Sequence, residues 1–279
     1  MSVAVVVDSA SDLPNELADA LGIRRVPLTI SLDGVDYKDG TELSRERFWE
    51  LAQRASDLPK TAAPSPAEFD AAFSSELDAG ANHVICLTMT KDLSATYQAA
   101  LAAASAYSGR VSVFDTRSLT VGEGLVAVSA ATAAQAGADT EQCQRIVRAA
   151  IERVVTFGML DTLENLRRGG RIGAASALLG TVMSFKPLIE VRDGAIEAAG
   201  RVRTRKSAIT SLLEKFAGGG PYERVGLVHA MANDLDAVLA RVREVTGVDE
   251  VVVSVMGATI GTHAGPGALG ISVLKHEPK

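Results

Sequence analysis

The residues best suited to chemistry form a hydroxyl-rich run, Thr88-Met89-Thr90-Lys91-Asp92-Leu93-Ser94-Ala95-Thr96. This run follows an apolar stretch, 84–87, typical of a buried strand, and precedes an alanine-rich stretch, 99–104, that favours a helix. The first N–H groups of a helix have no partner inside it, and the helix dipole favours negative charge there. The sequence therefore predicts an anion site at this loop. Alternatively, Ser94 and Thr96 only cap the helix.

A second candidate is His263, one of only four histidines in the chain. We expect it in a loop between a strand and the turn Gly265-Pro266-Gly267, whose glycines leave the backbone open to a ligand. An imidazolium there is able to pair with an anion or to donate a proton. A purely structural histidine is the alternative interpretation.

Arginines gather in the second half of a chain whose net charge is −6. They can surround an anionic head group or a phosphate, although solvated surface charge is the more ordinary role. These arginines are Arg167, Arg168, Arg171, Arg201, Arg203 and Arg205.

Composition limits the classes of protein to consider. Of the 279 residues, 47% are hydrophobic, which is enough for a sizeable core, and only 4% are aromatic. The acidic balance argues against a nucleic-acid binder that relies on bulk basic charge, and the few aromatic residues argue against a base-stacking platform. Any apolar pocket must therefore be lined mainly by aliphatic side chains.

The sequence also indicates where the protein is located and whether it holds a metal or a cofactor. Cys86 and Cys143 have no ligand spacing, so we predict no metal site, and two isolated thiols suit a reducing compartment. The pattern Gly122-x-Gly124 is similar to the glycine pattern of a dinucleotide-binding loop, but it begins eight residues after its strand ends. A dinucleotide-binding loop directly follows its strand, so no cofactor is predicted. No signal peptide or membrane-spanning run is evident, and we expect a cytoplasmic protein.

The order of expected elements predicts an α/β protein of two domains. In the first half, apolar strands such as 3–7 and 25–31 alternate with helices, including 120–136 and 140–154, the second capped by Thr140. This alternation predicts a mostly parallel sheet with helices on both faces. We place this N-terminal α/β domain at residues 1–156.

The second half mixes hairpin and crossover signals. A small-residue helix is expected over Ala174–Met183, and Asp193-Gly194 marks a hairpin. These signals predict a mixed α/β domain over residues 157–279. The helix 174–183 either forms part of a pocket wall or simply fills the core.

Nine short motifs in this order and spacing resemble the DegV family of bacterial lipid-binding proteins nearly end to end. They include Asp8-Ser9-Ala10-Ser11-Asp12-Leu13, Lys60-Thr61-Ala62-Ala63-Pro64-Ser65, Leu93-Ser94-Ala95-Thr96, Gly122-Glu123-Gly124, Arg203-Thr204-Arg205 and His263-Ala264-Gly265-Pro266-Gly267. The resemblance implies a fatty acid buried between two domains. Its carboxylate is expected at Thr61 and Ser94, with Arg203 and His263 at the mouth of the pocket. The sequence departs from the usual family pattern at Ala62-Ala63 and at Ala95.

The resemblance also implies a partner. Members of this type present the fatty acid to a separate fatty-acid kinase, which uses ATP to form an acyl-phosphate for phospholipid synthesis. The chain itself would then be a lipid-binding subunit and not an enzyme. The open alternatives are a free-standing hydrolase or transferase that uses Ser94 and His263, and a carrier of another anionic lipid.

Overall fold

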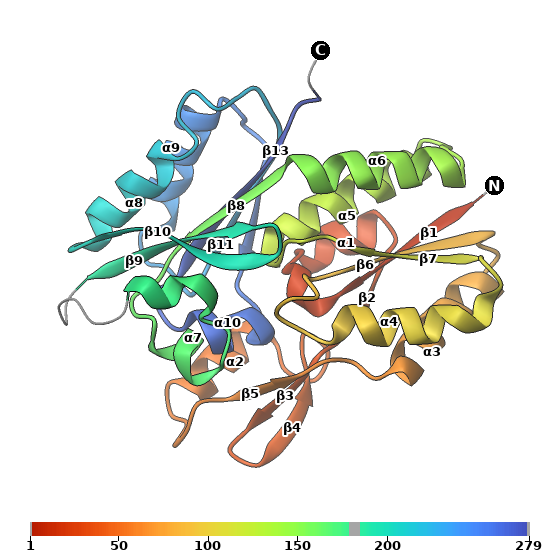
Figure 1. The fold of residues 1–279 in the computed structure, drawn as a ribbon, viewed down its shortest axis with the longest axis horizontal. Helices are drawn as coiled ribbons and strands as arrows, with labels where there is room; N and C mark the ends of the chain where they lie inside the picture. The colour runs from red at the N-terminus through yellow and green to blue at the C-terminus, as the bar shows by residue number, and fades with distance from the viewer. Residues whose placement is uncertain (1, 179–184, 278–279) are drawn as a thin grey trace.

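Three β-sheets organise the chain (Figure 1). The structure is a computed structural model, and it describes residues 2–178 and 185–277. The sheets have four, three and six strands, and the four-stranded and six-stranded sheets lie on opposite sides of one helix. Within the described residues, no helix is both long enough and apolar enough to cross a bilayer.

The first sheet is entirely parallel, as the alternation of strands and helices predicts. Its strands, in spatial order, are β2 (Ile23–Val26), β1 (Val3–Asp8), β6 (His83–Thr88) and β7 (Val111–Asp115). Every residue of β6 is buried, which explains its unbroken apolar pattern. The helices α3 (Pro66–Asp78) and α4 (Thr96–Ala104) pack against this sheet.

The prediction of one strand over 25–31 is wrong. Pro27 separates β2 from β3 (Thr29–Leu32), and β3 belongs to a different sheet. A proline has no N–H to donate to a ladder, which explains why the chain changes sheets at this point.

A small antiparallel sheet projects from the lower part of Figure 1. Its strands are β4 (Val35–Lys38), β3 and β5 (Lys60–Ala62). Asp33 and Gly34 connect β3 to β4 with φ values of 48° and 82°, as a two-residue hairpin turn requires. The adjoining helix α2 (Arg45–Ala52) begins after Ser44, whose hydroxyl accepts a bond from Arg47 N.

The second half forms the six-stranded mixed sheet. Its strands, in spatial order, are β10 (Ala195–Val202), β9 (Lys186–Arg192), β8 (Val154–Met159), β13 (Leu269–Lys275), β11 (Tyr222–His229) and β12 (Val251–Val255). Only β11 and β12 pair in parallel. The hairpin expected at Asp193-Gly194 joins β9 to β10. An α/β fold with one parallel and one mixed sheet is thus confirmed, whereas the boundary at residue 156 stays a prediction.

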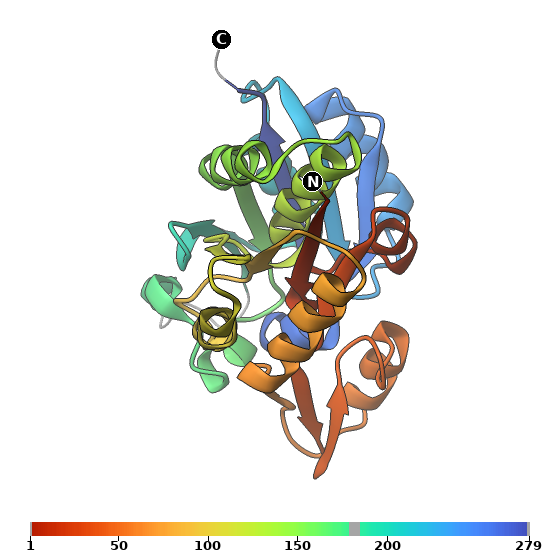
Figure 2. The same ribbon diagram turned by 90° about the vertical axis from the view of Figure 1, so that its right-hand side faces the viewer.

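Helix α5 (Thr120–Gln135) packs between the two larger sheets, and α6 (Thr140–Arg153) follows it (Figure 2). A Cβ on Gly122 would lie 2.3 Å from Thr156 Oγ1, and a Cβ on Gly124 would lie 2.9 Å from Leu13 Cδ2. These glycines therefore allow close packing of a helix on two sheets. The cap of α6 is Asp139, not Thr140 as predicted, and Asp139 forms a capping box with Gln142.

The other helices are short, and one of them differs from prediction. They are α1 (Asn15–Ala20), α7 (Glu164–Arg168), α8 (Arg205–Glu214), α9 (Leu235–Thr246), α10 (Ala258–Ala264) and the 3₁₀ turns Ser9–Ser11, Ser105–Tyr107 and Gly173–Leu178. The helix expected over 174–183 is a 3₁₀ segment as far as residue 178. The rest of that prediction lies outside the described residues.

Glu123 is fully buried in α5, and neither carboxyl oxygen has a hydrogen-bond partner among the described residues. Burial raises its pKa well above the usual value, so the native protein holds Glu123 protonated. As pH rises through the unfolded pKa near 4.5, only the unfolded chain releases this proton, and stability falls. We expect Glu123→Gln to match the wild type in urea unfolding at pH 4 and to be more stable at pH 8. Equal pH slopes for the two proteins would show that Glu123 is ionised in the fold.

Candidate functional site

A cavity of about 180 Å³ is lined by the six-stranded sheet, Thr61 of the small sheet, α10 and the loops that follow β6 and β7. The order of the parallel sheet reverses between β1 and β6, and ligands of such sheets bind beyond the carboxyl ends of the strands at this point. The loops that follow β6 and β7 supply Met89, Ser94 and Leu119 to the cavity wall. The remaining apolar wall comes from Leu28, Ala63, Leu93, Ala95, Phe157, Leu160, Leu166, Ile189, Val191, Ile196, Val228, Met256, Ile260, Ala264, Ala268 and Leu269.

The floor of the cavity is a patch of the six-stranded sheet that has no side chains. Gly158 on β8 is paired with Gly270 on β13, and both line the cavity. A Cβ at Gly270 would lie 3.0 Å from Val228 Cγ1. The paired glycines therefore leave room at the middle of a sheet that is otherwise rich in branched side chains.

Thr61 and His263 meet at the polar part of the wall. Thr61 lies on β5, opposite Ile30 of β3, and its Oγ1 is 2.9 Å from His263 Nε2. The prediction that His263 lies in a loop is wrong, because it lies in the last turn of α10. A Cβ on Gly169 would lie 2.3 Å from His263 Nδ1, so only glycine allows this packing.

The surroundings of His263 indicate which of these two side chains donates in the hydrogen bond between them. His263 Nδ1 is buried and has no hydrogen-bond partner among the described residues. A bare ring nitrogen is less costly to bury than an unpaired N–H, which favours the neutral tautomer with its proton on Nε2. Thr61 Oγ1 then accepts from His263, and the hydroxyl hydrogen of Thr61 remains available for a ligand.

Ser94 lines the same cavity from the loop before α4. The cap position of this helix is Ala95, so Ser94 is not the cap that the sequence suggested. Its Oγ accepts from Thr96 N at 3.3 Å and lies 2.8 Å from Thr96 Oγ1. Ser94 therefore stands two residues before the first residue of the helix and lines the cavity.

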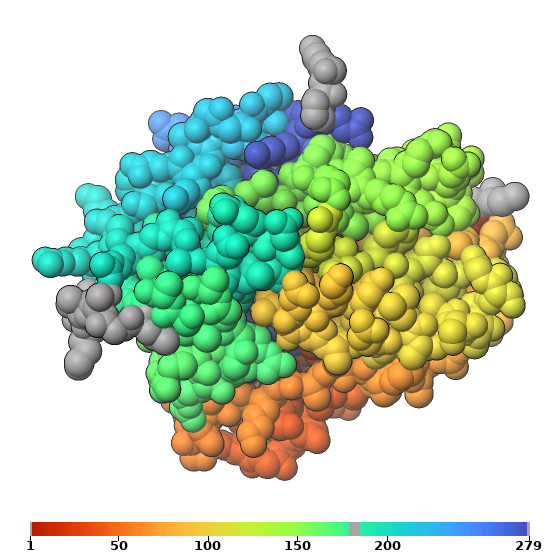
Figure 3. All heavy atoms as spheres, viewed as in Figure 1, coloured from red at the N-terminus to blue at the C-terminus, as the bar shows by residue number. Residues whose placement is uncertain are grey.

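Of the arginines gathered in the second half, Arg171 is the one that reaches the cavity wall. Its guanidinium donates to Leu93 O at 3.2 Å and to Gly169 O at 2.7 Å. These bonds join the segment after α7 to the loop before α4, which also meet at the surface in Figure 3. Arg203 is exposed between β10 and α8 and does not line the cavity. The structure thus brings together Thr61, Ser94 and His263, but not Arg203.

Burial and the charge of Arg171 lower the pKa of His263 to about 4. The imidazolium expected from the sequence is therefore wrong for the ligand-free protein, in which this ring is neutral at pH 7. Below the usual pKa of 6.5 only the unfolded chain gains a proton here, so stability falls as pH drops towards 4. We expect NMR of lipid-free protein to show a neutral His263 at pH 5.5. A titration midpoint near 6.5 would contradict this burial.

No group of three or more histidine, cysteine or acidic side chains within residues 2–178 and 185–277 is arranged to hold a metal ion. The chemistry open to the site is that of two hydroxyls, a neutral imidazole and a guanidinium at one side of an apolar cavity. This set can donate hydrogen bonds to an anion whose remaining surface is apolar.

Known proteins resemble this chain over its whole length. The profile described as "Uncharacterised protein, DegV family" matches residues 2–276. A DegV domain-containing protein of Deinococcus radiodurans is 37% identical over 98% of both chains. A DegV family protein from Thermus thermophilus, described by its fatty-acid binding, superposes with a TM-score of 0.91 at 33% identity over 99% of this chain and 100% of its own.

A DegV from Bacillus subtilis, described as a fatty acid binding protein, has a TM-score of 0.87 at 30% identity over 99% of this chain and 100% of its own. The resemblance inferred from the short motifs is thus confirmed by whole-chain similarity in both sequence and structure. The chain belongs to the DegV family.

Proposed function

We propose that this protein binds one long-chain fatty acid in the cavity between its sheets, with the carboxylate at Thr61 and Ser94. The observation that carries the proposal is that the bonded pair Thr61 and His263, together with Ser94, lines a cavity whose wall is mainly apolar. Fatty-acid binding by the Thermus and Bacillus relatives supports it.

The carboxylate end of the ligand needs donors. Burial of an ionised carboxylate without hydrogen-bond partners is very unfavourable in free energy. Hydrogen bonds from hydroxyl and guanidinium groups offset that unfavourable free energy. Thr61 has a hydroxyl hydrogen available, and Ser94 lines the same cavity. Arg171, which lines the cavity, supplies the compensating positive charge.

The acyl end needs an apolar surface. Each buried CH₂ group contributes about 0.8 kcal/mol, so a long chain gains most of its affinity from burial. The aliphatic walls and the glycine pair Gly158 and Gly270 offer that surface. Neither residues 173–178 nor Phe185 line the cavity, and the rest of the wall that the sequence suggested, 179–183, lies outside the described residues.

A free-standing hydrolase or transferase is the second candidate. A Ser–His mechanism needs an acidic group that orients the histidine through Nδ1. His263 Nδ1 has no such partner among the described residues, and His263 bonds to Thr61 and not to Ser94. The geometry therefore favours binding over catalysis by this chain alone.

Mass spectrometry of an organic extract from the purified protein tests the binding proposal. We expect about one equivalent of long-chain fatty acid per chain. An extract without fatty acid, from protein that also fails to take up added oleate, would overturn the proposal. Recovery of a different anionic lipid would favour the alternative carrier.

We further propose that the bound fatty acid is presented to a separate fatty-acid kinase, which forms an acyl-phosphate from ATP. Phosphoryl transfer depends on positive charge near the reacting oxygens. Arg203 is exposed and is not part of the cavity wall, so Arg203→Ala should keep its lipid. With the cognate kinase it should form acyl-phosphate about tenfold more slowly or worse. Arg47→Ala, which changes an exposed arginine on α2, is the matched control. Equal rates for all three proteins would remove Arg203 from the transfer step.

A further inference from the structure

The helix that carries His263 is held at its first turn by a side chain from the small sheet. Asp39 accepts from Ala258 N at 3.2 Å, from Thr259 N at 3.1 Å and from Thr259 Oγ1 at 2.5 Å. Asp39 is only 4% exposed. Because the first N–H groups of a helix have no partners inside it, this carboxylate replaces the cap that α10 does not supply itself.

A second carboxylate, that of Asp12, binds the residue that directly precedes α10. Asp12 accepts from Gly257 N at 2.7 Å and from Thr120 Oγ1 at 2.5 Å. A Cβ on Gly257 would lie 2.8 Å from Asp12 Oδ1, so this approach requires glycine. We call Asp12 and Asp39 together the aspartate clamp.

The small sheet that supplies Asp39 also supplies Thr61. Asp39 directly follows β4, Thr61 lies on β5, and β3 pairs with both strands. Helix α10 has seven residues and therefore spans about 10 Å. One sheet thus contacts both ends of the helix, through Asp39 at the start and through the Thr61–His263 bond at the end.

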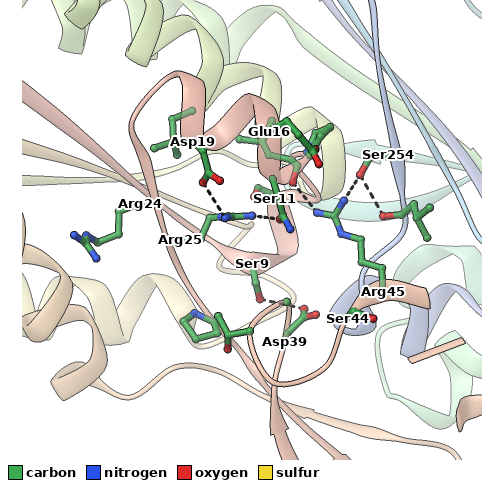
Figure 4. Close-up of a pocket in the computed structure, with 18 of the residues that line it drawn as sticks. Ser9, Ser11, Glu16, Asp19, Arg24, Arg25, Asp39, Ser44, Arg45 and Ser254 are labelled. Atoms are coloured by element: carbon green, nitrogen blue, oxygen red, sulfur yellow. Dashed lines mark hydrogen bonds and ion pairs between the residues drawn. The ribbon is translucent and has the colours of Figure 1, made fainter. Parts of the chain in front are cut away.

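Asp39 also lines a separate polar cleft of about 830 Å³ (Figure 4). There Ser9 Oγ donates to Asp39 Oδ2 at 3.1 Å. Arg45 donates to Leu13 O at 2.7 Å and to Ser254 Oγ. Arg45 therefore bonds to groups of the protein itself at the wall of this cleft.

We propose that Asp12 and Asp39 are positioning residues that fix α10 so that His263 meets Thr61 and the carboxylate end of the cavity is ordered before the ligand arrives. For its ligand, this inference rests on the proposed function. Carboxylates at a helix N-terminus favour its docking, because they pair with its free N–H groups and its dipole. A receptor ordered in advance binds more tightly, because less ordering is left to do on binding.

Asp39→Asn tests the clamp, because the amide nitrogen cannot accept a bond from α10. The first readout is the imidazole NMR spectrum of His263 in lipid-free protein, which reports the tautomer and the Thr61 bond. We expect the wild type to show one fixed neutral tautomer and Asp39→Asn to show an exchange-averaged ring. The dissociation constant for oleate should rise about tenfold.

The matched control is Asp139→Ala, which removes a capping carboxylate from α6, a helix that does not line the cavity. This control should lower the melting temperature but leave both the His263 spectrum and oleate affinity unchanged. A folded Asp39→Asn protein with the wild-type spectrum and affinity would overturn the proposal.

Two further results of this experiment have a defined interpretation. If Asp39→Asn does not fold, Asp12→Asn alters the other clamp carboxylate, which accepts from Gly257 N, and an unchanged His263 spectrum in that variant would overturn the proposal. If the wild type binds no oleate, the proposed function fails. The lipid-free spectrum still decides whether the clamp positions His263.

Discussion

Replacement of both Thr61 and Ser94 by alanine should weaken oleate binding by about 10²- to 10⁴-fold. Each lost hydrogen bond to a charged group costs about 1.5–3 kcal/mol, and the double variant loses two. Both side chains are only half-buried, so the fold should survive their truncation. Fluorescent fatty-acid displacement measures the change in affinity.

The control for this prediction is Thr61→Ser, which keeps the hydroxyl and should bind oleate within a few-fold of wild type. Circular dichroism should show the same helix content in all three proteins. If the double variant is folded and still binds oleate as tightly as wild type, the carboxylate lies elsewhere.

Oleate at about 100 times its dissociation constant should stabilise the native protein by about 2.7 kcal/mol, because a ligand that binds only the folded state shifts the unfolding equilibrium. For a chain of this length, that corresponds to a rise in melting temperature of about 5 °C. Delipidated protein in a thermal scan with and without oleate provides the measurement.

Methyl oleate separates the two ends of the ligand in the same scan. It has the acyl chain but no carboxylate, so it should stabilise the protein less than oleate does. A melting temperature that oleate does not change would count against a buried tail.

The helix α10 shows why sequence reasoning missed part of the site. Its segment contains Gly261 and the β-branched Thr259, Ile260 and Thr262, which are weak helix formers. The helix exists because Asp12 and Asp39, more than 200 residues away, bind its first turn. Phe48 and Trp49 also pack on it where a Cβ of Gly261 would lie 2.7 and 2.8 Å from their rings. Such tertiary support leaves no local signal.

The elements with strong local signals were easier to predict. The apolar run over 3–7 and the Asp193-Gly194 hairpin both follow from local chemistry, and each appears in the structure. The hydroxyl of Ser94 was a local signal for the site as well. By contrast, a basic stretch in a sequence does not reveal which arginine faces a cavity, and only the fold distinguishes Arg171 from Arg203.

A crystal structure of the protein with bound oleate is the most direct test of a fatty-acid site at Thr61 and Ser94. We expect the carboxylate within about 2.7–3.2 Å of both hydroxyl oxygens. The acyl chain should run through the cavity over Gly158 and Gly270. Oleate in the polar cleft beside Arg45, or in the cavity with its carboxylate away from Thr61 and Ser94, would contradict the proposed site.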